Sequence, residues 1–177
     1  MTVYFIGAGP GAADLITVRG ARVLGNCRTC VYAGSLVPQE MLELCPDGAN
    51  LVDTARMPLD AIIDVITTAD AARHDVARLH SGDLSLYSAM TEQQRLLSER
   101  GVVTEIVPGV PAFAAAAAAL GSELTVPGVG QSLLITRVST LSTDMPPGET
   151  LPELAAAGVT LALHLAAHRA QEIVGAL

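Results

Sequence analysis

Short hydrophobic runs alternate with longer segments of mixed polarity along the whole chain. The short segments predict strands, and the longer segments between them predict helices. The predicted strands of the first part are Val3–Ile6, Thr29–Ala33, Asn50–Asp53, Asp75–Leu79 and Val103–Val107. The predicted helices are residues 13–24, 38–44, 58–71, 86–100 and 111–120. This alternation predicts an α/β fold with a mainly parallel five-stranded sheet, against which the alanine-rich last helix should pack closely.

The pattern changes after Gly121, where residues 122–130 are rich in proline and glycine and are typical of an interdomain linker. A second α/β part follows, with strands predicted at Ser132–Thr136 and Val159–Leu165, a helix near Leu151–Ala157 and another from about Ala167. Two strands make a poor independent core. We therefore predict an N-terminal domain over 1–121 and an incomplete C-terminal domain over 131–177.

Composition narrows the possible partners. A formal net charge of −8 disfavours nucleic acid, because neutralising phosphates needs a basic surface. All ten basic residues are arginine, and without lysine the chain cannot form a Schiff base or a P-loop. Charged residues interrupt every apolar run before membrane-spanning length, and the N-terminus does not resemble a signal peptide. We expect a cytoplasmic protein with no membrane contact and a compact small-molecule ligand.

Three cysteines, Cys27, Cys30 and Cys45, leave one unpaired, and we expect no disulfide framework. Cys27 and Cys30 have C-x-x-C spacing, but they precede a strand and no second pair completes a zinc tetrad. We interpret them as structural and expect no protein-bound metal.

Three glycine-bearing loops follow predicted strands, at the end where parallel sheets gather ligands. The first, Gly7–Ala12, is close to a dinucleotide fingerprint, but the second strand supplies no carboxylate for a ribose and Pro10 removes an amide donor. A nicotinamide cofactor and a plain tight turn both remain alternatives there. The second loop, His80–Tyr87, contains Asp83, which could accept from a ligand or cap the next helix. The third is Val107–Ala112.

Taken in order, these motifs resemble the signature of the tetrapyrrole methylases. The resemblance rests on Tyr4–Gly11, Asp14–Gly20, Tyr32–Pro38, Arg78–Tyr87 and Glu105–Val110, and it continues through Glu123–Gly128, Leu134–Arg137 and Thr160–Leu165. It implies a two-domain enzyme, usually a homodimer, that binds S-adenosylmethionine between its domains and releases S-adenosylhomocysteine. Tyr32–Pro38 and Ser139–Pro146 look most like the members that methylate carbon 11 of precorrin-4 in cobalamin synthesis.

The resemblance also implies site residues. The expected cofactor contacts are Pro10, Ser81, Gly82, Asp83, Leu86, Pro111, Ala112 and Leu165. The expected substrate contacts are Ser35, Leu36 and Arg137. Three positions depart from the family pattern: Leu84 replaces a proline, Ser88 a glycine and Pro111 a threonine. Similar enzymes continue for roughly another third of their length, so we expect the chain to bind cofactor or turn over less well than a longer one.

Methyl transfer from a sulfonium to an electron-rich carbon needs positioning more than a base, and we name no general base. His80 is expected to be a structural hydrogen-bonding residue, and Tyr87 a packed ring. The alternative functions are methylation of cobalt-precorrin-4, another precorrin or uroporphyrinogen III, a nicotinamide-dependent oxidoreductase built on Gly7–Ala12, and a non-catalytic remnant.

Overall fold

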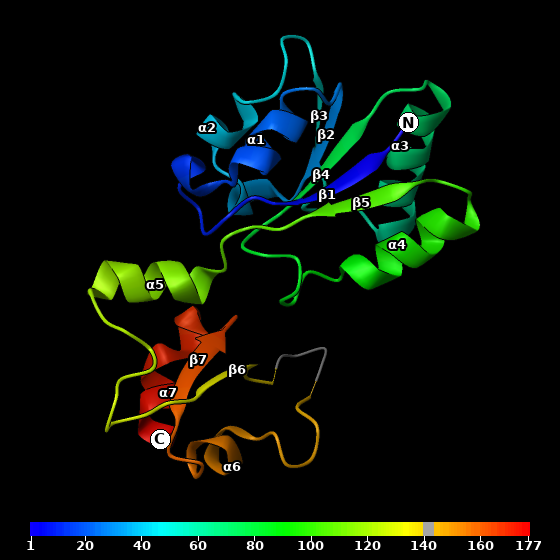
Figure 1. The fold of residues 1–177 in the computed structure, drawn as a ribbon. Helices are drawn as coiled ribbons and strands as arrows, with labels where there is room; N and C mark the ends of the chain where they lie inside the picture. The colour runs from blue at the N-terminus through cyan, green and yellow to red at the C-terminus, as the bar shows by residue number, and fades with distance from the viewer. Residues whose placement is uncertain (140–143) are drawn as a thin grey trace. The chain divides into compact units, whose positions relative to one another are not determined.

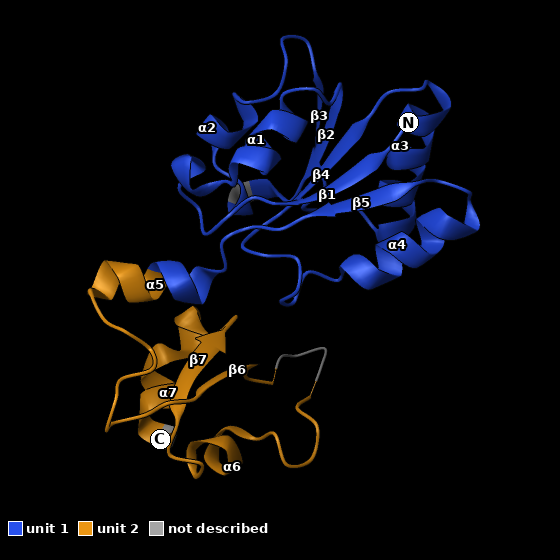
Figure 2. Ribbon diagram, in the orientation of Figure 1, with its two compact units in different colours: residues 1–115 blue, residues 116–177 orange. Residues whose placement is uncertain are grey.

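The computed structural model describes residues 1–139 and 144–177, without the side chains of Ser35 and Ala176. The chain forms two compact units, Met1–Ala115 and Ala116–Leu177, which Figure 2 colours separately. The division falls inside helix α5 (Ala112–Leu120). None of the residues of α5 is buried, so the close packing predicted for this helix is wrong. The domain limits at 121 and 131 stay a prediction.

Unit 1 is built on a parallel sheet of five strands in the order β3-β2-β4-β1-β5. The strands are β1 (Val3–Gly7), β2 (Thr29–Tyr32), β3 (Asn50–Asp53), β4 (Val76–His80) and β5 (Thr104–Val107). All five predicted strands are confirmed to within about two residues. Because every pairing is parallel, all five strands end at the same side of the sheet, which we call the carboxyl edge.

Helices connect the strands and cover both faces of this sheet (Figure 1). They are the 3₁₀ turn Ala13–Leu15, α1 (Val18–Leu24), the 3₁₀ turn Gly34–Leu36, α2 (Gln39–Leu42), α3 (Leu59–Ala71) and α4 (Met90–Glu99). Alternate β1 residues pack to opposite sides: Ile6 joins a core with α1 and α2, and Phe5 joins a second core with α3 and α4. The central strands β1, β2 and β4 are therefore largely buried between two helical layers, whereas the edge strands β3 and β5 are partly exposed.

Two helices begin later than the sequence predicts. The helix expected from Ala13 starts at Val18, because Ala13–Leu15 form a 3₁₀ turn and the Thr17 side chain accepts from the Gly20 amide at 3.1 Å as the N-cap. The helix expected from Leu86 starts at Met90, because Tyr87 and Ala89 have left-handed backbone angles, with φ of +53° and +52°. Asp83 is thus too far upstream to cap that helix.

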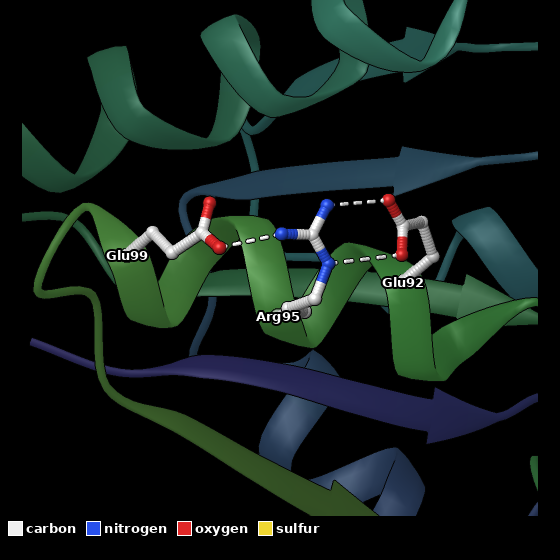
Figure 3. A network of polar contacts seen from close by, with 3 residues as sticks. All are labelled: Glu92, Arg95 and Glu99. Atoms are coloured by element: carbon white, nitrogen blue, oxygen red, sulfur yellow. Dashed lines mark hydrogen bonds and ion pairs between the residues drawn. The ribbon is translucent and has the colours of Figure 1, made fainter.

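The outward face of α4 carries a chain of exposed ion pairs (Figure 3). Arg95 donates to Glu92 at 2.7 Å and to Glu99 at 2.5 Å, one turn away in each direction. All three side chains are more than half exposed, so water and salt screen these pairs and their contribution to stability is small.

Unit 2 contains a parallel pair of strands, β6 (Leu133–Arg137) and β7 (Thr160–His164). Helices α6 (Leu151–Ala155) and α7 (Ala170–Ala176) and a 3₁₀ turn at Ala167–Arg169 accompany the pair. A capping box between Thr150 and Glu153 starts α6. The buried core is small and consists of Val138, Ala166 and Ile173. The second predicted α/β segment is confirmed in its order of elements, and residues 140–143 of its long loop lie outside the described residues.

Candidate cofactor and substrate site

The three predicted glycine loops meet at the carboxyl edge of unit 1, after the adjacent strands β4, β1 and β5. Gly9 and Gly82 exchange two backbone hydrogen bonds, with the Gly9 amide donating at 3.1 Å and the Gly82 amide at 2.7 Å. The Ala8 amide donates to the His80 carbonyl at 2.8 Å. The first and second loops are therefore held together by main-chain bonds.

The third loop packs into the other two without room for a side chain. A Cβ atom on Gly109 would lie 2.3 Å from the Gly82 carbonyl oxygen and 2.7 Å from Gly7 Cα. A Cβ atom on Gly7 would lie 2.5 Å from the Gly109 amide nitrogen. Glycine is required at both positions because the three backbones come this close. Thr17 adds a hydrogen bond from its hydroxyl to the Pro108 carbonyl at 3.3 Å.

Asp83 links the second and third loops through its carboxylate. One oxygen accepts from the Gly109 amide at 2.8 Å, and the other accepts from the Ser85 amide at 2.9 Å and the Ser85 hydroxyl at 2.5 Å. Partial burial raises the pKa of this carboxyl, but hydrogen bonds from Ser85, Gly109 and Leu84 outweigh burial, so the pKa of Asp83 lies below its usual value. The ionised Asp83 carboxylate therefore joins the second loop to the third by hydrogen bonds.

The structure brings together those expected cofactor residues that unit 1 contains. Pro10 lies between Gly9 and Gly11, which have φ of +80° and +127°. Ser81 is exposed, Leu86 is half-buried and Gly82 has φ +66°. Pro111 and Ala112 lead into α5, with the Ala112 amide nitrogen 3.8 Å from where a Gly82 Cβ would be.

Leu165 belongs to unit 2, where it follows β7 with φ +58° and is 58% exposed. Arg137 is also in unit 2, on β6, and its guanidinium donates to the carbonyls of Val138 at 3.1 Å and Asp144 at 3.2 Å. The placement of these two residues against the loops of unit 1 stays a prediction. Leu36, in unit 1, is 60% exposed in the turn after β2, and the side chain of Ser35 lies outside the described part of the chain.

His80 and Tyr87 differ from what was expected of them. His80 is buried and stacks on Phe5, with ring centroids 5.8 Å apart. The Nε2 atom of His80 has no hydrogen-bond partner among the described residues. The expected hydrogen-bonding role of His80 is therefore only partly confirmed. Burial, and then the Arg78 charge, lower its pKa to about 3, against a smaller effect of a hydrogen bond with the Ser88 backbone. Tyr87 is 45% exposed, so its ring is less closely packed than expected.

A buried polar group that the sequence did not reveal lies beneath this edge. Arg78 on β4 is 5% exposed and donates to the Gln93 side chain at 3.0 Å and to the Thr54 hydroxyl at 3.2 Å. The Thr54 hydroxyl in turn donates to the Tyr32 carbonyl at 2.9 Å. Burial lowers the pKa of Arg78 to about 10, so it stays charged near neutral pH. The sequence alone does not predict this network, because its members come from four separate segments of the chain.

The cysteines are unpaired, and Cys27 and Cys30 are buried in the core beside α1 and α2. Burial, with smaller effects of Asp75 and Cys45, raises the pKa of Cys27 to about 12, so its thiol is protonated and unreactive. The described residues contain no cluster of histidine, cysteine and carboxylate side chains that could hold a metal ion. Nor does any described helix have the length and hydrophobicity needed to cross a membrane.

Comparison with known proteins identifies the family of this chain. The model of the Tetrapyrrole (Corrin/Porphyrin) Methylases matches residues 2–177. The chain belongs to the tetrapyrrole methylases. It is 62% identical over 173 residues to the precorrin-4 C(11)-methyltransferase of Rhodococcus erythropolis, covering 98% of this chain and 70% of the relative. The enzyme of Mycobacterium tuberculosis strain CDC 1551 / Oshkosh is 62% identical over 174 residues, with 98% and 69% covered.

Solved structures of this tetrapyrrole methylase family agree with the fold. A cobalt precorrin-4 methyltransferase has a TM-score of 0.93 and 38% identity, over 99% of this chain and 73% of that one. A uroporphyrin III C-methyltransferase from Thermus thermophilus has a TM-score of 0.77 and 25% identity, over 99% and 72%. The α/β fold with a parallel five-stranded sheet and a smaller second α/β part is thereby confirmed.

Proposed function

We propose that this chain transfers a methyl group from S-adenosylmethionine to carbon 11 of precorrin-4, giving precorrin-5 and S-adenosylhomocysteine in cobalamin synthesis. The observation that carries this proposal is the 62% identity to precorrin-4 C(11)-methyltransferases over nearly the whole chain. The relatives that act on cobalt-precorrin-4 and uroporphyrinogen III are less similar, at 41% and 30%. The cobalt-free substrate is therefore favoured over these alternatives.

The chemistry fits a site made chiefly of backbone. The nucleophilic ring carbon attacks the methyl carbon in line with the carbon–sulfur bond, and sulfur takes the electron pair of the bond that breaks. No proton has to move in that step, so catalysis depends on holding the two reactants in line. Backbone loops fixed by mutual hydrogen bonds lose little freedom on binding, which supports such positioning.

The cofactor contacts are part of the proposal. Pro10, Ser81, Gly82, Asp83, Leu86, Pro111 and Ala112 would surround S-adenosylmethionine in unit 1, and Leu165 would contact it from unit 2. Glycines with positive φ at positions 9, 11 and 82 let the ligand approach the main chain. The substrate would lie near Ser35, Leu36 and Arg137. A homodimer and a cytoplasmic location complete the proposal.

The test is product identification. The chain is incubated with S-adenosylmethionine carrying a ¹³C methyl group and, separately, with precorrin-4, cobalt-precorrin-4 and uroporphyrinogen III. We expect labelled precorrin-5 with the methyl carbon bonded to carbon 11, seen by mass spectrometry and carbon NMR. Labelling of uroporphyrinogen III alone would reject the proposed acceptor. A product that forms only with NADH would instead favour an oxidoreductase.

A further inference from the structure

The carboxyl edge of unit 1 divides into two halves along the strand order. The three interlocked glycine loops follow β4, β1 and β5, which are neighbours, whereas β2 and β3 lie together at the other end of the sheet. The expected substrate residues Ser35 and Leu36 are in the loop after β2. The loop after β3, residues 54–58, is next to it, about 5 Å away by strand spacing.

These two loops are joined by Asp53, the last residue of β3. One carboxylate oxygen of Asp53 accepts from the Gly34 amide at 2.9 Å and from the Ala55 amide at 2.8 Å. A Cβ atom on Gly34 would lie 2.8 Å from the Ala55 methyl carbon, and Gly34 has φ +43°. The Thr54 amide donates to the Tyr32 carbonyl at 2.8 Å. The backbone on both sides of Gly34 is thus fixed against the segment that leads to Arg56.

Arg56 is the single basic residue in the five loops that leave this edge. These loops are residues 8–17, 33–38, 54–58, 81–89 and 108–111, described except for the Ser35 side chain, and their other charged residues are Asp14 and Asp83. The Arg56 side chain is exposed, and among the described residues it has no hydrogen bond or ion pair. Asp53, its nearest carboxylate in sequence, accepts two backbone amides with one oxygen and makes no ion pair with Arg56.

We propose that Arg56 binds a peripheral carboxylate of the tetrapyrrole and so fixes the orientation of the macrocycle over the loop that contains Ser35 and Leu36. This inference rests on the proposed acidic tetrapyrrole substrate. A precorrin carries acetate and propionate side chains around its ring, and an anionic substrate needs cations in a protein whose net charge is −8. A guanidinium holds a carboxylate by two parallel hydrogen bonds, which sets direction as well as affinity.

The position of Arg56 also argues against a role in cofactor binding. One strand, β2, lies between β3 and β4, and the loop after β4 contains the expected cofactor contacts nearest to Arg56. At about 5 Å for each strand spacing, the ends of β3 and β4 are about 10 Å apart, and the loop after β1 is about 5 Å farther. The Asp53 carboxylate and the Thr54 backbone hold the base of Arg56 on the β2–β3 side. Substrate affinity and cofactor affinity should therefore respond differently to a change at Arg56.

The experiment compares Arg56→Gln and Arg56→Lys with Arg28→Gln. Arg28 is a matched control, because it is an exposed arginine in a loop of the same sheet but at the end where the strands begin. Precorrin-4 affinity is measured by absorbance titration, S-adenosylhomocysteine affinity by calorimetry, and folding by thermal unfolding. Titrations at low and high salt test for a charge contact.

We expect Arg56→Gln to raise the dissociation constant for precorrin-4 about tenfold, as loss of one charge-assisted contact does. Arg56→Lys, which keeps the charge without the planar fork, should lie between it and the wild type. Arg28→Gln should stay within about twofold, and S-adenosylhomocysteine affinity should stay constant in all variants. In turnover, KM should rise while kcat at saturating substrate stays close to the wild-type value.

Unchanged precorrin-4 affinity in Arg56→Gln would overturn the inference. So would an equal loss of S-adenosylhomocysteine affinity, which would place Arg56 on the cofactor. A folded wild-type chain that binds neither ligand would overturn the proposed function as well, so the two failures are distinguishable.

Discussion

Gly109→Ala tests whether the interlocked loops form the cofactor site. The added methyl carbon would lie 2.3 Å from the Gly82 carbonyl oxygen, whereas ordinary contacts begin near 3.4 Å, so the loops must separate by about 1 Å. That carbonyl accepts the Gly9 amide at 3.1 Å, and the Gly109 amide itself donates to Asp83 at 2.8 Å. Relieving the clash therefore strains or breaks two hydrogen bonds.

The expected cost follows from these two effects. Overpacking costs about 1–3 kcal/mol and a lost hydrogen bond about 1 kcal/mol, so we expect the free energy of unfolding to fall by about 2–4 kcal/mol. In a chain of this size, Tm should fall by about 5–12 °C. Because a 1 Å displacement of positioning groups costs about a hundredfold in rate, S-adenosylhomocysteine affinity and turnover should fall further than stability explains.

Gly25→Ala is the matched control for this substitution. Gly25 follows α1 in an ordinary helical conformation, with φ −65°, and an added Cβ atom there would meet its nearest neighbours at 3.4 Å. Its effect should stay within about 0.5 kcal/mol. Urea and thermal unfolding, with calorimetry of S-adenosylhomocysteine, measure both variants. Wild-type stability and cofactor affinity in Gly109→Ala would refute the argument that these loops touch as closely as described.

Three further predictions concern buried and charged groups. Asp83→Asn should destabilise the protein by at most about 1 kcal/mol at neutral pH, because Asp83 is only half-buried. The folded pKa of Asp83 is lowered, so the difference from wild type should shrink below about pH 4 and vanish as pH falls through the folded pKa. A constant difference in urea titrations would contradict this. Gln93→Leu removes one hydrogen-bond partner of the buried Arg78 charge and should lower the free energy of unfolding by about 2–3 kcal/mol. Adding Arg78→Met should recover part of that loss. A double-mutant cycle with no coupling between the two positions would refute the contact. Burial lowers the folded pKa of His80 to about 3, so the contribution of neutral His80 to stability is complete above the unfolded pKa of about 6.5 and is lost as pH falls. His80→Phe should therefore make stability less dependent on pH in the acid range. An unchanged dependence of stability on pH would contradict this.

Periodicity in the sequence was sufficient to predict the order of the elements, because the central strands β1, β2 and β4 are largely buried and mostly apolar. The helix starts were less predictable. At Met90 the start is set by left-handed residues Tyr87 and Ala89, which no propensity rule favours. At Val18 it is set by a single threonine cap.

The candidate site was only partly predictable for a similar reason. Glycine loops after strands are visible in the sequence, and their shared edge follows from parallel pairing. Two contacts depend on which loops become neighbours: the hydrogen bond from Gly109 to Asp83, and the hydrogen bond from Gly34 to Asp53. The strand order decides which loops are neighbours. Alternation alone does not give strand order. Arg56 was therefore indistinguishable in the sequence from any exposed arginine.

The most direct test of the central claim is calorimetry of S-adenosylhomocysteine binding to this chain and to a version extended to the length of its relatives. The account predicts saturable binding, one ligand per chain, that NADH does not displace and that Gly109→Ala weakens. Binding by the extended version alone would place essential contacts beyond residue 177. Failure of both folded proteins to bind the ligand would contradict the methyltransferase assignment.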